Sequence, residues 1–381
     1  MSRPSGGCSS CEIFGNRDPS ARWTFFVPKN LQCARGHVGT PCRKVSPARR
    51  DRNVSPEHDF QVTKKYHSRE DKEDTIQKTF RLGTRGSALA LTQSGWVADR
   101  IRERHPGVSV ELVTIRTKGD IMQDVSLAAI GGKGLFIKEI EEALLRGDVD
   151  LAVHSMKDVP AELPEELEIA VTPLREDPRD VLISRGDRKL EQMPHGARIG
   201  TGSLRRAFQL RNRMPDLEIV PLRGNLDTRI RKLETEGLDG VILAAAGIRR
   251  MGWASRVSQF IPVELMLPAV GQGVIGIETR RDDARCRESV AFLNDPVTFC
   301  EVGAERGFLK RLGGGCQLPI AAFAKKNGGE IAVEGLVGSL DGRAMIRHRV
   351  TGSAAEFEKL GENLAEHILD QGGRALLDAV Y

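Results

Sequence analysis

From Thr79 onward, short apolar runs alternate with amphipathic helical stretches, and this alternation constrains the fold more than any other feature of the chain. In the first such unit, strands are predicted at Thr79–Thr84, Val108–Ile115 and Val149–His154, with one helix beginning near Ser87 and another running from Phe136 to Gly147. The second helix has apolar residues at the spacing of a single buried face. Strands and helices in this order predict an α/β domain with a mostly parallel sheet.

The same alternation recurs in a second unit further along the chain. Strands are predicted at Arg198–Thr201, Leu217–Leu222 and Val241–Ala244, and helices at Leu204–Arg213 and Leu226–Glu236. The two units also begin alike, because Arg81–Ser87 (RLGTRGS) and Arg198–Ser203 (RIGTGS) both place a small hydroxyl residue at a strand-to-helix turn. The N–H groups of such a turn can hold an anion. We therefore expect paired α/β domains that face a common cleft.

After about residue 296 the pattern changes again. Helices are predicted at Glu301–Arg311 and Ala354–Gln371, and strands at Ile320–Ala324, Ile331–Val337 and Arg343–Val350. Strands grouped between two helices, without strict alternation, predict a small α+β domain.

The first 78 residues differ from the rest. They are rich in Ser, Gly, Pro and Arg, lack periodicity, and carry 15 Lys and Arg against 9 Asp and Glu. This composition predicts a mostly disordered extension. An organelle transit peptide is one interpretation, since Glu12 and Asp18 are the only acids in the first 50 residues. The alternatives are an extension from a misassigned start codon and, less favoured, a small zinc knuckle built from Cys8, Cys11, Cys33 and Cys42.

Charge and apolar runs exclude several classes of function. Residues 79–381 carry 42 Lys and Arg against 43 Asp and Glu, so no nucleic-acid-binding surface is predicted there. The longest apolar runs, such as Val241–Ala246, are far too short to span a bilayer. The seven cysteines are odd in number and irregularly spaced, which argues against a disulfide framework and favours a reducing compartment.

The most distinctive stretch is His154–Pro160 (HSMKDVP), which directly follows a predicted buried strand. Ligands of α/β proteins bind at the carboxyl ends of the strands, so Lys157 and Asp158 are expected to project into a cleft. A surface turn with a local ion pair of little energetic value accounts for these residues equally well.

Arginines recur at or just after the predicted strand ends. They are Arg85, Arg205, Arg206, Arg223, Arg229 and Arg250. Such arginines are usually only solvated surface residues, but convergence of several of these loops on one sheet edge indicates a substrate with many carboxylates. Arginine binds a carboxylate through two parallel hydrogen bonds, which explains its use in place of lysine.

Three glycines, Gly313–Gly315, precede Cys316 and give a loop that can approach another surface closely. By itself Cys316 reads more readily as an inert thiol, and no neighbouring histidine suggests a nucleophile pair. Gly271–Gly276 matches G-x-G-x-x-G without the required strand-helix context, and Gly131–Gly134 lacks phosphate-loop spacing. No H-E-x-x-H motif or carboxylate cluster marks a catalytic metal.

Taken together, these motifs resemble the hydroxymethylbilane synthase (porphobilinogen deaminase) family from about Phe80 to Tyr381. The resemblance is carried by Thr84–Ser87 (TRGS), Gly131–Phe136 (GGKGLF), Val153–Pro160 (VHSMKDVP), Gly200–Arg206 (GTGSLRR), Leu222–Asn225 (LRGN), Leu267–Gly273 (LPAVGQG) and Gly314–Gln317 (GGCQ). Each motif is weak alone, but their occurrence in this order leaves little room for coincidence.

The resemblance implies a fold and a reaction. The fold is α/β, with two domains like those of periplasmic binding proteins and a C-terminal α+β domain that carries a cofactor. The implied domains are 79–175 plus 274–292, 176–270 and 296–381, after the 1–78 extension, with a hinge at Val270–Gly273. The implied cofactor is a dipyrromethane attached to Cys316 by a thioether. Four porphobilinogens are then added head to tail, each with loss of ammonia, and hydrolysis releases hydroxymethylbilane for porphyrin and heme biosynthesis.

The resemblance also implies roles for matching residues. Asp158 is implied to be catalytic, stabilising positive charge on pyrrole nitrogens and steering protons. Cofactor-binding residues are implied to be Cys316, Arg205, Arg206, Lys157, Ser203 and Thr201, and substrate-binding residues Arg85, Ser87, Arg223, Arg229 and Arg250. Lys133 and Lys138 lie in a segment that resembles the family's mobile lid.

Two features depart from the family pattern. Gly202 stands where many relatives have a second hydroxyl residue, so a backbone group is expected to replace one side-chain hydrogen bond. The extension 1–78 has no counterpart in typical bacterial members, although the remaining sequence is similar to theirs. A cytoplasmic monomer is therefore expected, with a plastid as the alternative location if residues 1–78 are a transit peptide.

Two other classes of function stay open at this point. A non-catalytic binding protein for an anionic metabolite suits paired, arginine-lined domains, but it needs neither Asp158 nor Cys316, and no export signal is apparent near Met1. A nucleic-acid or zinc-linked regulator rests on the basic extension alone. We expect deletion of residues 1–78 to leave catalytic turnover intact.

Overall fold

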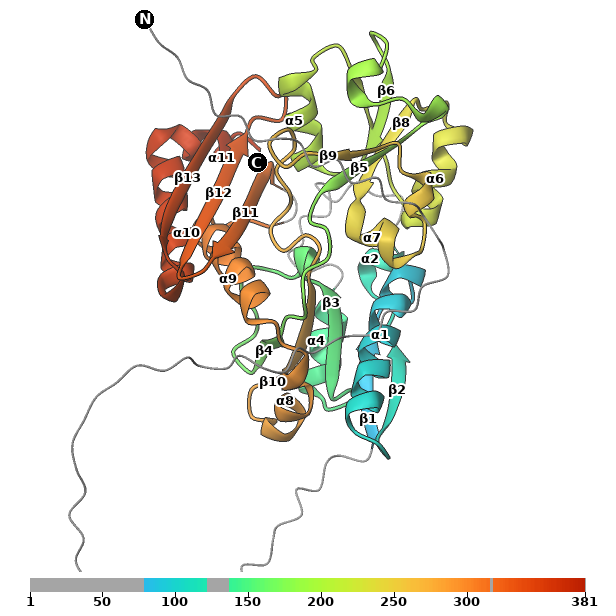
Figure 1. The fold of residues 1–381 in the computed structure, drawn as a ribbon, viewed down its shortest axis with the longest axis vertical. Coiled ribbons are helices and arrows are strands. Elements are labelled where there is room, and N and C mark those ends of the chain that lie inside the picture. The colour runs from blue at the N-terminus through green and yellow to red at the C-terminus, as the bar shows by residue number, and fades with distance from the viewer. Residues whose placement is uncertain (1–78, 122–136, 316–317, 381) are drawn as a thin grey trace, which may run out of the picture. The chain divides into compact units, whose positions relative to one another are not determined.

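The computed structural model describes residues 79–121, 137–315 and 318–380, which form three β-sheets with helices packed against them (Figure 1). The first sheet has five strands in the order β2-β1-β3-β10-β4. They are β1 (Thr79–Thr84), β2 (Ser109–Thr114), β3 (Leu151–Ser155), β4 (Leu167–Val171) and β10 (Ile275–Arg280). Strand β1 is parallel to β2 and β3, whereas β10 is antiparallel to β3 and β4. The prediction of a mostly parallel sheet is therefore confirmed, with β10 as the exception.

The second sheet repeats this arrangement in the order β7-β6-β8-β5-β9. Its strands are β5 (Asp180–Ser184), β6 (Arg198–Thr201), β7 (Glu218–Pro221), β8 (Gly240–Ala244) and β9 (Gln259–Ile261). Strand β6 is parallel to β7 and β8, and β5 is antiparallel to β8 and β9. The antiparallel strand therefore occupies the same place in both sheets.

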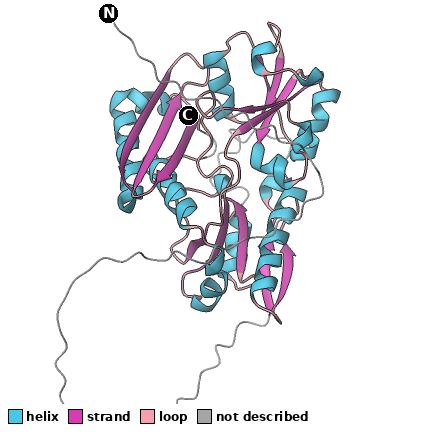
Figure 2. Cartoon of the chain, viewed as in Figure 1, coloured by secondary structure: helices cyan, strands magenta, loops and turns pink. Residues whose placement is uncertain are grey.

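Helices cover both faces of these two sheets (Figure 2). Those of the first unit are α1 (Ala88–Arg104), α2 (Lys118–Ile121), α4 (Lys138–Leu145) and α8 (Ala284–Val290), and those of the second are α5 (Leu204–Arg213), α6 (Leu226–Thr235) and α7 (Ala245–Arg250). Because both faces are covered, every residue of β8 is buried, and successive residues of β5 alternate between two apolar clusters. Within the described ranges, no helix is long and apolar enough to cross a membrane.

Two segments connect the sheets. The chain leaves the first sheet through residues 172–179, between β4 and β5, and returns through residues 262–274, between β9 and β10. The two segments touch each other, because the Arg175 Nε donates to the Gln272 carbonyl oxygen at 3.0 Å. Gly273, with φ of +92°, approaches the Glu176 carbonyl so closely that a Cβ atom would collide with it. A glycine is therefore required where the returning segment passes the outgoing one.

The C-terminal part forms the third sheet, a meander of three antiparallel strands. Its elements are α9 (Pro296–Arg311), β11 (Ile320–Asn327), β12 (Glu330–Gly338), β13 (Met345–Ser353), α10 (Phe357–Ile368) and α11 (Arg374–Asp378). Phe308 of α9, Val333 of β12 and Leu364 of α10 share one apolar core. At Gly361 a Cβ would collide with the Ala304 carbonyl oxygen, so this glycine lets α10 pack closely against α9. The predicted α/β class with a C-terminal α+β domain is confirmed.

The observed elements differ from the predicted ones mainly at their ends. Helix α9 begins at Pro296 rather than Glu301, because the Asp295 side chain accepts a hydrogen bond from the Thr298 N–H and caps the helix earlier. The long C-terminal helix predicted at Ala354–Gln371 is divided into a 3₁₀ turn, α10 and a π turn that contains Gly372 in a left-handed conformation. Strands β4, β5 and β9 were not predicted.

Candidate active site

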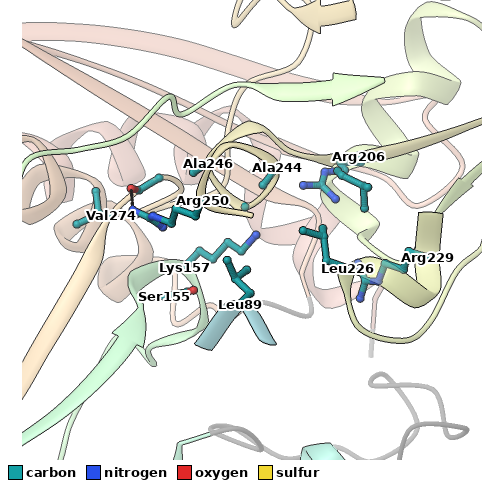
Figure 3. Close-up of a pocket in the computed structure, with 14 residues that line it drawn as sticks. Leu89, Ser155, Lys157, Arg206, Leu226, Arg229, Ala244, Ala246, Arg250 and Val274 are labelled. Atoms are coloured by element: carbon teal, nitrogen blue, oxygen red, sulfur yellow. Dashed lines mark hydrogen bonds between the residues drawn. The ribbon is translucent and has the colours of Figure 1, made fainter. Parts of the chain in front are cut away.

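A pocket lies between the carboxyl ends of strands from both five-stranded sheets and the returning segment (Figure 3). The first sheet contributes Ser155 and Lys157, beside Leu89 of α1. The second contributes Arg206 of α5, Leu226 and Arg229 of α6, Ala244 of β8 and Arg250 of α7, and the returning segment contributes Gly271, Gly273 and Val274. The structure thus brings together two residues of the HSMKDVP stretch, Ser155 and Lys157, and three of the predicted arginines.

Lys157 lies in a 3₁₀ turn, Met156–Asp158, that directly follows β3. The Met156 N–H donates to the Val274 carbonyl at 2.9 Å, which ties the start of the turn to the returning segment. Burial lowers the pKa of Lys157 to about 8; the negative charge of Asp158 opposes this shift and the positive charge of Arg206 adds to it. Figure 3 shows the Lys157 side chain extending from the turn into the pocket.

Asp158 is the last residue of the same turn and is partly buried. Among the residues that the structure describes, none donates a hydrogen bond to its carboxylate. Its charge is nevertheless felt across the pocket, because it acts to raise the pKa of both Lys157 and Arg229. The turn therefore presents a carboxylate with unused acceptor capacity next to a cluster of cations.

Arg205 and Arg206 begin α5 and are both buried around one carboxylate, Asp180 of β5. Arg205 donates to Asp180 through Nη1 at 2.7 Å and Nη2 at 3.2 Å, and Arg206 through Nη2 at 2.8 Å and Nε at 3.0 Å. Gln272 donates to the same carboxylate at 2.9 Å. Burial alone would raise the pKa of Asp180, but the two guanidinium groups outweigh it and hold that pKa well below the usual range. Asp180 is thus the anion that fixes both arginines.

The structure separates these two arginines, which the sequence treats as a pair. Arg206 lines the pocket, while Arg205 does not and instead donates to the carbonyl oxygen of Leu267 at 2.8 Å. Arg205 therefore joins α5 to the returning segment as well as to Asp180. Binding of a cofactor by both residues stays a prediction.

The remaining pocket arginines have fewer partners. Arg229 donates its Nε to the Gly224 carbonyl at 2.7 Å, and burial, reinforced by the charges of Arg206 and Arg223, lowers its pKa to about 10. Arg250 donates one Nη to the Gly273 carbonyl at 2.7 Å, and burial lowers its pKa too. Each guanidinium group therefore keeps further donors for a ligand.

The hydroxyl residues at the two strand-to-helix turns behave differently. The Ser87 hydroxyl accepts a hydrogen bond from the Ala90 N–H at 3.3 Å and caps α1, whereas the Ser203 hydroxyl makes no such bond at the start of α5. Instead, the Thr201 hydroxyl accepts from the Ser203 N–H at 3.2 Å. A Cβ atom at Gly202 would collide with the Leu222 carbonyl oxygen, so a hydroxyl residue does not fit there without movement.

Other predicted site residues lie elsewhere or outside the described ranges. Arg85 follows β1 and Arg223 follows β7, both partly buried, but neither lines this pocket. Lys138 begins α4 and is exposed. Cys316, Lys133 and the four cysteines of the extension lie outside the described residues. Within the described ranges, Cys286 and Cys300 are buried free thiols, and burial raises the pKa of Cys286 to about 12.

The sequence interpretation missed the residues that hold the site together. The main ones are Asp180, Gln272 and the buried pair Arg175–Glu305, whose Nη1 and Oε1 atoms are 2.6 Å apart. Glu305 of α9 also accepts from the N–H of Gly271 at 2.7 Å, so it fastens both connecting segments to the C-terminal domain. One feature of the sequence could have revealed this pairing: Asp180 directly precedes the apolar run Val181–Ile183. An acid in such a position is expected to be buried, and a buried carboxylate requires a charged partner.

The donor set of the pocket defines the ligand that fits it. Among the described residues, four cationic side chains line it, Lys157, Arg206, Arg229 and Arg250, and no carboxylate residue does. Such a site fits a small molecule with several carboxylates, since Arg and Lys bind carboxylates by charge-assisted hydrogen bonds. A metal ion does not suit these donors, and no group of three or more His, Cys, Asp or Glu among the described residues could hold one.

Comparisons with known proteins show which family this chain is similar to. A family model described as porphobilinogen deaminase, dipyrromethane cofactor binding domain, matches residues 80–288, and one described as its C-terminal domain matches residues 299–370. The chain is 63% identical to the porphobilinogen deaminase of Syntrophus aciditrophicus over 298 residues, covering 78% of this chain and 97% of that protein. It is 53% identical to that of Geotalea daltonii over 304 residues, covering 80% and 95%. Among solved structures, the methionine-binding protein MetQ aligns with a TM-score of 0.39 and 14% identity, over 57% of this chain and 89% of that chain.

Proposed function

This chain belongs to the porphobilinogen deaminase family, and from that premise we propose how its own residues divide the reaction among them. The activity is hydroxymethylbilane synthesis: four porphobilinogens are condensed head to tail with loss of ammonia on an enzyme-bound dipyrromethane primer, and hydrolysis releases the linear product. The observation that carries the assignment is the convergence of Lys157, Arg206, Arg229 and Arg250 on one pocket, beside Asp158.

The four cations are proposed to bind the acetate and propionate groups of cofactor and substrate. Arg229 and Arg250 each use one guanidinium nitrogen for a backbone carbonyl and retain further donors, which suits bidentate binding of a carboxylate. Burial makes such bonds stronger than they would be in water. Arg206 adds a further positive charge to the pocket and is held in place by its hydrogen bonds to Asp180. Together these groups would orient the carboxylates of the bound molecule beside Asp158.

Asp158 is proposed to be the catalytic carboxylate. Positive charge develops on a pyrrole nitrogen when ammonia leaves porphobilinogen, and a nearby carboxylate stabilises that charge and accepts the N–H hydrogen bond. The position suits this role because no described residue donates to the Asp158 carboxylate, so its acceptor sites remain available to a ligand. Lys157 beside it, with a pKa of about 8, can carry a proton or bind a carboxylate near neutral pH.

Cys316 is proposed to hold the dipyrromethane through a thioether. When bound, that group supplies the pyrrole carbon to which the first new unit is joined. The residues that lead to the attachment point begin with Gly313, whose φ of +67° is a backbone conformation that favours glycine. The cation-lined pocket fits the four carboxylates expected of two joined pyrrole units.

The other assignments complete the proposal. Arg205, Thr201 and Ser203 are assigned to the cofactor, and Arg85, Ser87 and Arg223 to the substrate, with Lys133 and Lys138 in a lid. The domain division 79–175 plus 274–292, 176–270 and 296–381 is supported by the three sheets and the two connecting segments. A cytoplasmic monomer is proposed as its working state.

The test is the intact mass of the denatured protein, measured for the parent and for Cys316→Ser. The proposal expects the parent to exceed its sequence mass by two deaminated pyrrole units and the variant to show no excess. Asp158→Asn is expected to retain the added mass while losing turnover by about 100-fold or more. A parent that stays unmodified after incubation with porphobilinogen, or an Asp158→Asn variant with parent turnover, would refute the corresponding assignment.

A further inference from the structure

Helix α9 of the C-terminal domain contacts the segment that follows Asp158 through one arginine. Arg306 donates through Nη2 to the carbonyl oxygens of Pro160 at 2.8 Å and Ala161 at 3.2 Å. Its Nη1 lies 3.5 Å from the Val159 carbonyl oxygen and 3.9 Å from the Met156 sulfur. One guanidinium group thus spans three consecutive carbonyls immediately after the proposed catalytic residue.

The same face of α9 supplies an apolar contact beside this arginine. Val302, one helical turn before Arg306, is 2% exposed and packs in a cluster with Met156, Val159 and Val274. The turn that carries Asp158 therefore rests on α9 through both its side chains and its backbone. The Pro160 and Ala161 carbonyl oxygens need donors once they are removed from water, and Arg306 supplies them.

The position of Asp158 depends on how its backbone is held at both ends. The turn begins at Met156, whose N–H is bonded to the Val274 carbonyl, and it ends against Arg306. No described residue donates to the Asp158 carboxylate, so no side-chain contact corrects its position if the backbone shifts. A shift of about 1 Å in a reacting group can cost about 100-fold in rate.

We propose that Arg306 is a positioning residue, which sets the turn carrying Lys157 and Asp158 against the helix that leads to the cofactor cysteine. This rests on the proposed roles of Asp158 and Cys316. Helix α9 ends at Arg311, and Cys316 follows five residues later in the sequence. A helix has about 3.6 residues per turn, so Arg306 contacts the turn Met156–Asp158 from a position within about two turns of the helix end. The helix that contacts the turn of Asp158 is thus the one that precedes Cys316 in the sequence.

The experiment compares Arg306→Met, Arg306→Lys and a matched control, Arg311→Gln, which removes an arginine from the same helix that pairs with Glu366 near the surface. Intact mass first establishes that each variant carries the cofactor. We expect Arg306→Met to lower kcat by about 10- to 100-fold while changing KM by less than about threefold, because Arg206, Arg229 and Arg250 lie outside this turn and hold the carboxylates in place. Arg306→Lys should restore part of kcat, since an ammonium group keeps the charge without the planar fork. Arg311→Gln should stay within about twofold of the parent.

A double-mutant cycle with Asp158→Glu separates positioning from general support. If Arg306 acts through Asp158, Arg306→Met should lower kcat much less in the Asp158→Glu background than in the parent. Equal losses in both backgrounds, or a kcat for Arg306→Met matching that of Arg311→Gln, would overturn the inference. Should Arg306→Met fail to fold, Arg306→Lys decides: a parent-like kcat for it overturns the inference as well. Full activity of Asp158→Glu together with Asp158→Asn would instead place the fault in the proposed function.

Discussion

The two five-stranded sheets share a strand order and direction but use their antiparallel strands for different electrostatic purposes. Each such strand carries one carboxylate with no solvent exposure: Glu278 on β10 and Asp180 on β5. Glu278 is bonded to the His154 Nε2 at 2.9 Å, and its Oε1 has no partner among the described residues. Asp180 is held by Arg205, Arg206 and Gln272. Equivalent topology therefore does not determine equivalent chemistry; the charge of the partners does.

The consequence appears at the pocket. In the second sheet, the buried carboxylate anchors permanently charged arginines, so that side of the pocket stays cationic over a wide pH range. In the first sheet, the buried carboxylate bonds to β3, the strand that leads to the turn Met156–Asp158. Among the described residues, the only pocket-lining cation from that side is Lys157, which has a pKa of about 8. The charge that the second sheet contributes to the pocket is therefore constant near neutral pH, whereas the charge that the first sheet contributes changes with pH.

The largest test of this contrast is Asp180→Asn. Removing the charge leaves two buried guanidinium groups without their anion, so the free energy of unfolding should fall by about 3–5 kcal/mol at pH 7. Urea unfolding followed by far-UV circular dichroism measures it. Because the pKa of Asp180 is lowered below its usual 3.8, the stabilisation is fully present above that value and is lost only as pH falls through the lower folded-state pKa. An unchanged urea midpoint for Asp180→Asn would show that Asp180 does not stabilise the two buried arginines.

Glu278→Gln should be milder, at about 1–2 kcal/mol, because the amide can keep one hydrogen bond to His154 and no permanently charged group is stranded. The same urea titration, run beside Asp180→Asn, ranks the two substitutions directly. A loss for Glu278→Gln equal to that for Asp180→Asn would mean that the two buried carboxylates are energetically alike after all.

The titratable half of the pocket predicts a pH effect on binding. The lowered pKa of Lys157 means that its ammonium group loses its proton as pH rises through about 8, so the KM for porphobilinogen should increase roughly tenfold between pH 7 and pH 9. In Lys157→Arg the cation persists, and the KM should stay nearly flat over that range. Steady-state rates at several pH values decide the matter, and a parallel rise in both proteins would assign the effect to another group.

The smallest predicted difference concerns the two strand-to-helix turns. Ser87→Ala removes a hydrogen bond to the Ala90 N–H and should lower the free energy of unfolding by about 1 kcal/mol. Ser203→Ala removes no such bond and should cost under about 0.5 kcal/mol. Thermal melts of both variants under one condition compare them. The reverse ranking would show that the second turn is the one that depends on its hydroxyl.

Much of this organisation could be predicted from the sequence, because periodicity reports which faces are buried. The strand at Val241–Ala244 and the helix at Leu204–Arg213 were predicted with bounds close to those observed. Strand β9 could not be predicted, since three residues are too few to show a period. Strand β5 is buried on both faces, and its short apolar run, Val181–Ile183, shows no alternation.

The residue types of the site, and their positions near strand ends, could be predicted from the sequence. The contacts between these residues could not. Arg205 and Arg206 were identified from their place after a strand, yet their anion, Asp180, lies 25 residues earlier on an unpredicted strand. The contact of Arg306 with Pro160 spans 146 residues. No local pattern encodes partners at such separations, because they meet only when three sheets have assembled.

The position of β10 has a consequence for how the chain is made. The second sheet is built from a continuous stretch, residues 180–261. The first sheet is built from residues 79–171 and is completed only by residues 275–280. That late strand is inserted between β3 and β4, which do not pair with each other. On the ribosome, the sheet that is begun first is therefore completed second. Until residue 280 has emerged, strand β3, which leads to the turn Met156–Asp158, has an open edge, while the arginine-bearing sheet downstream of it already has all its strands.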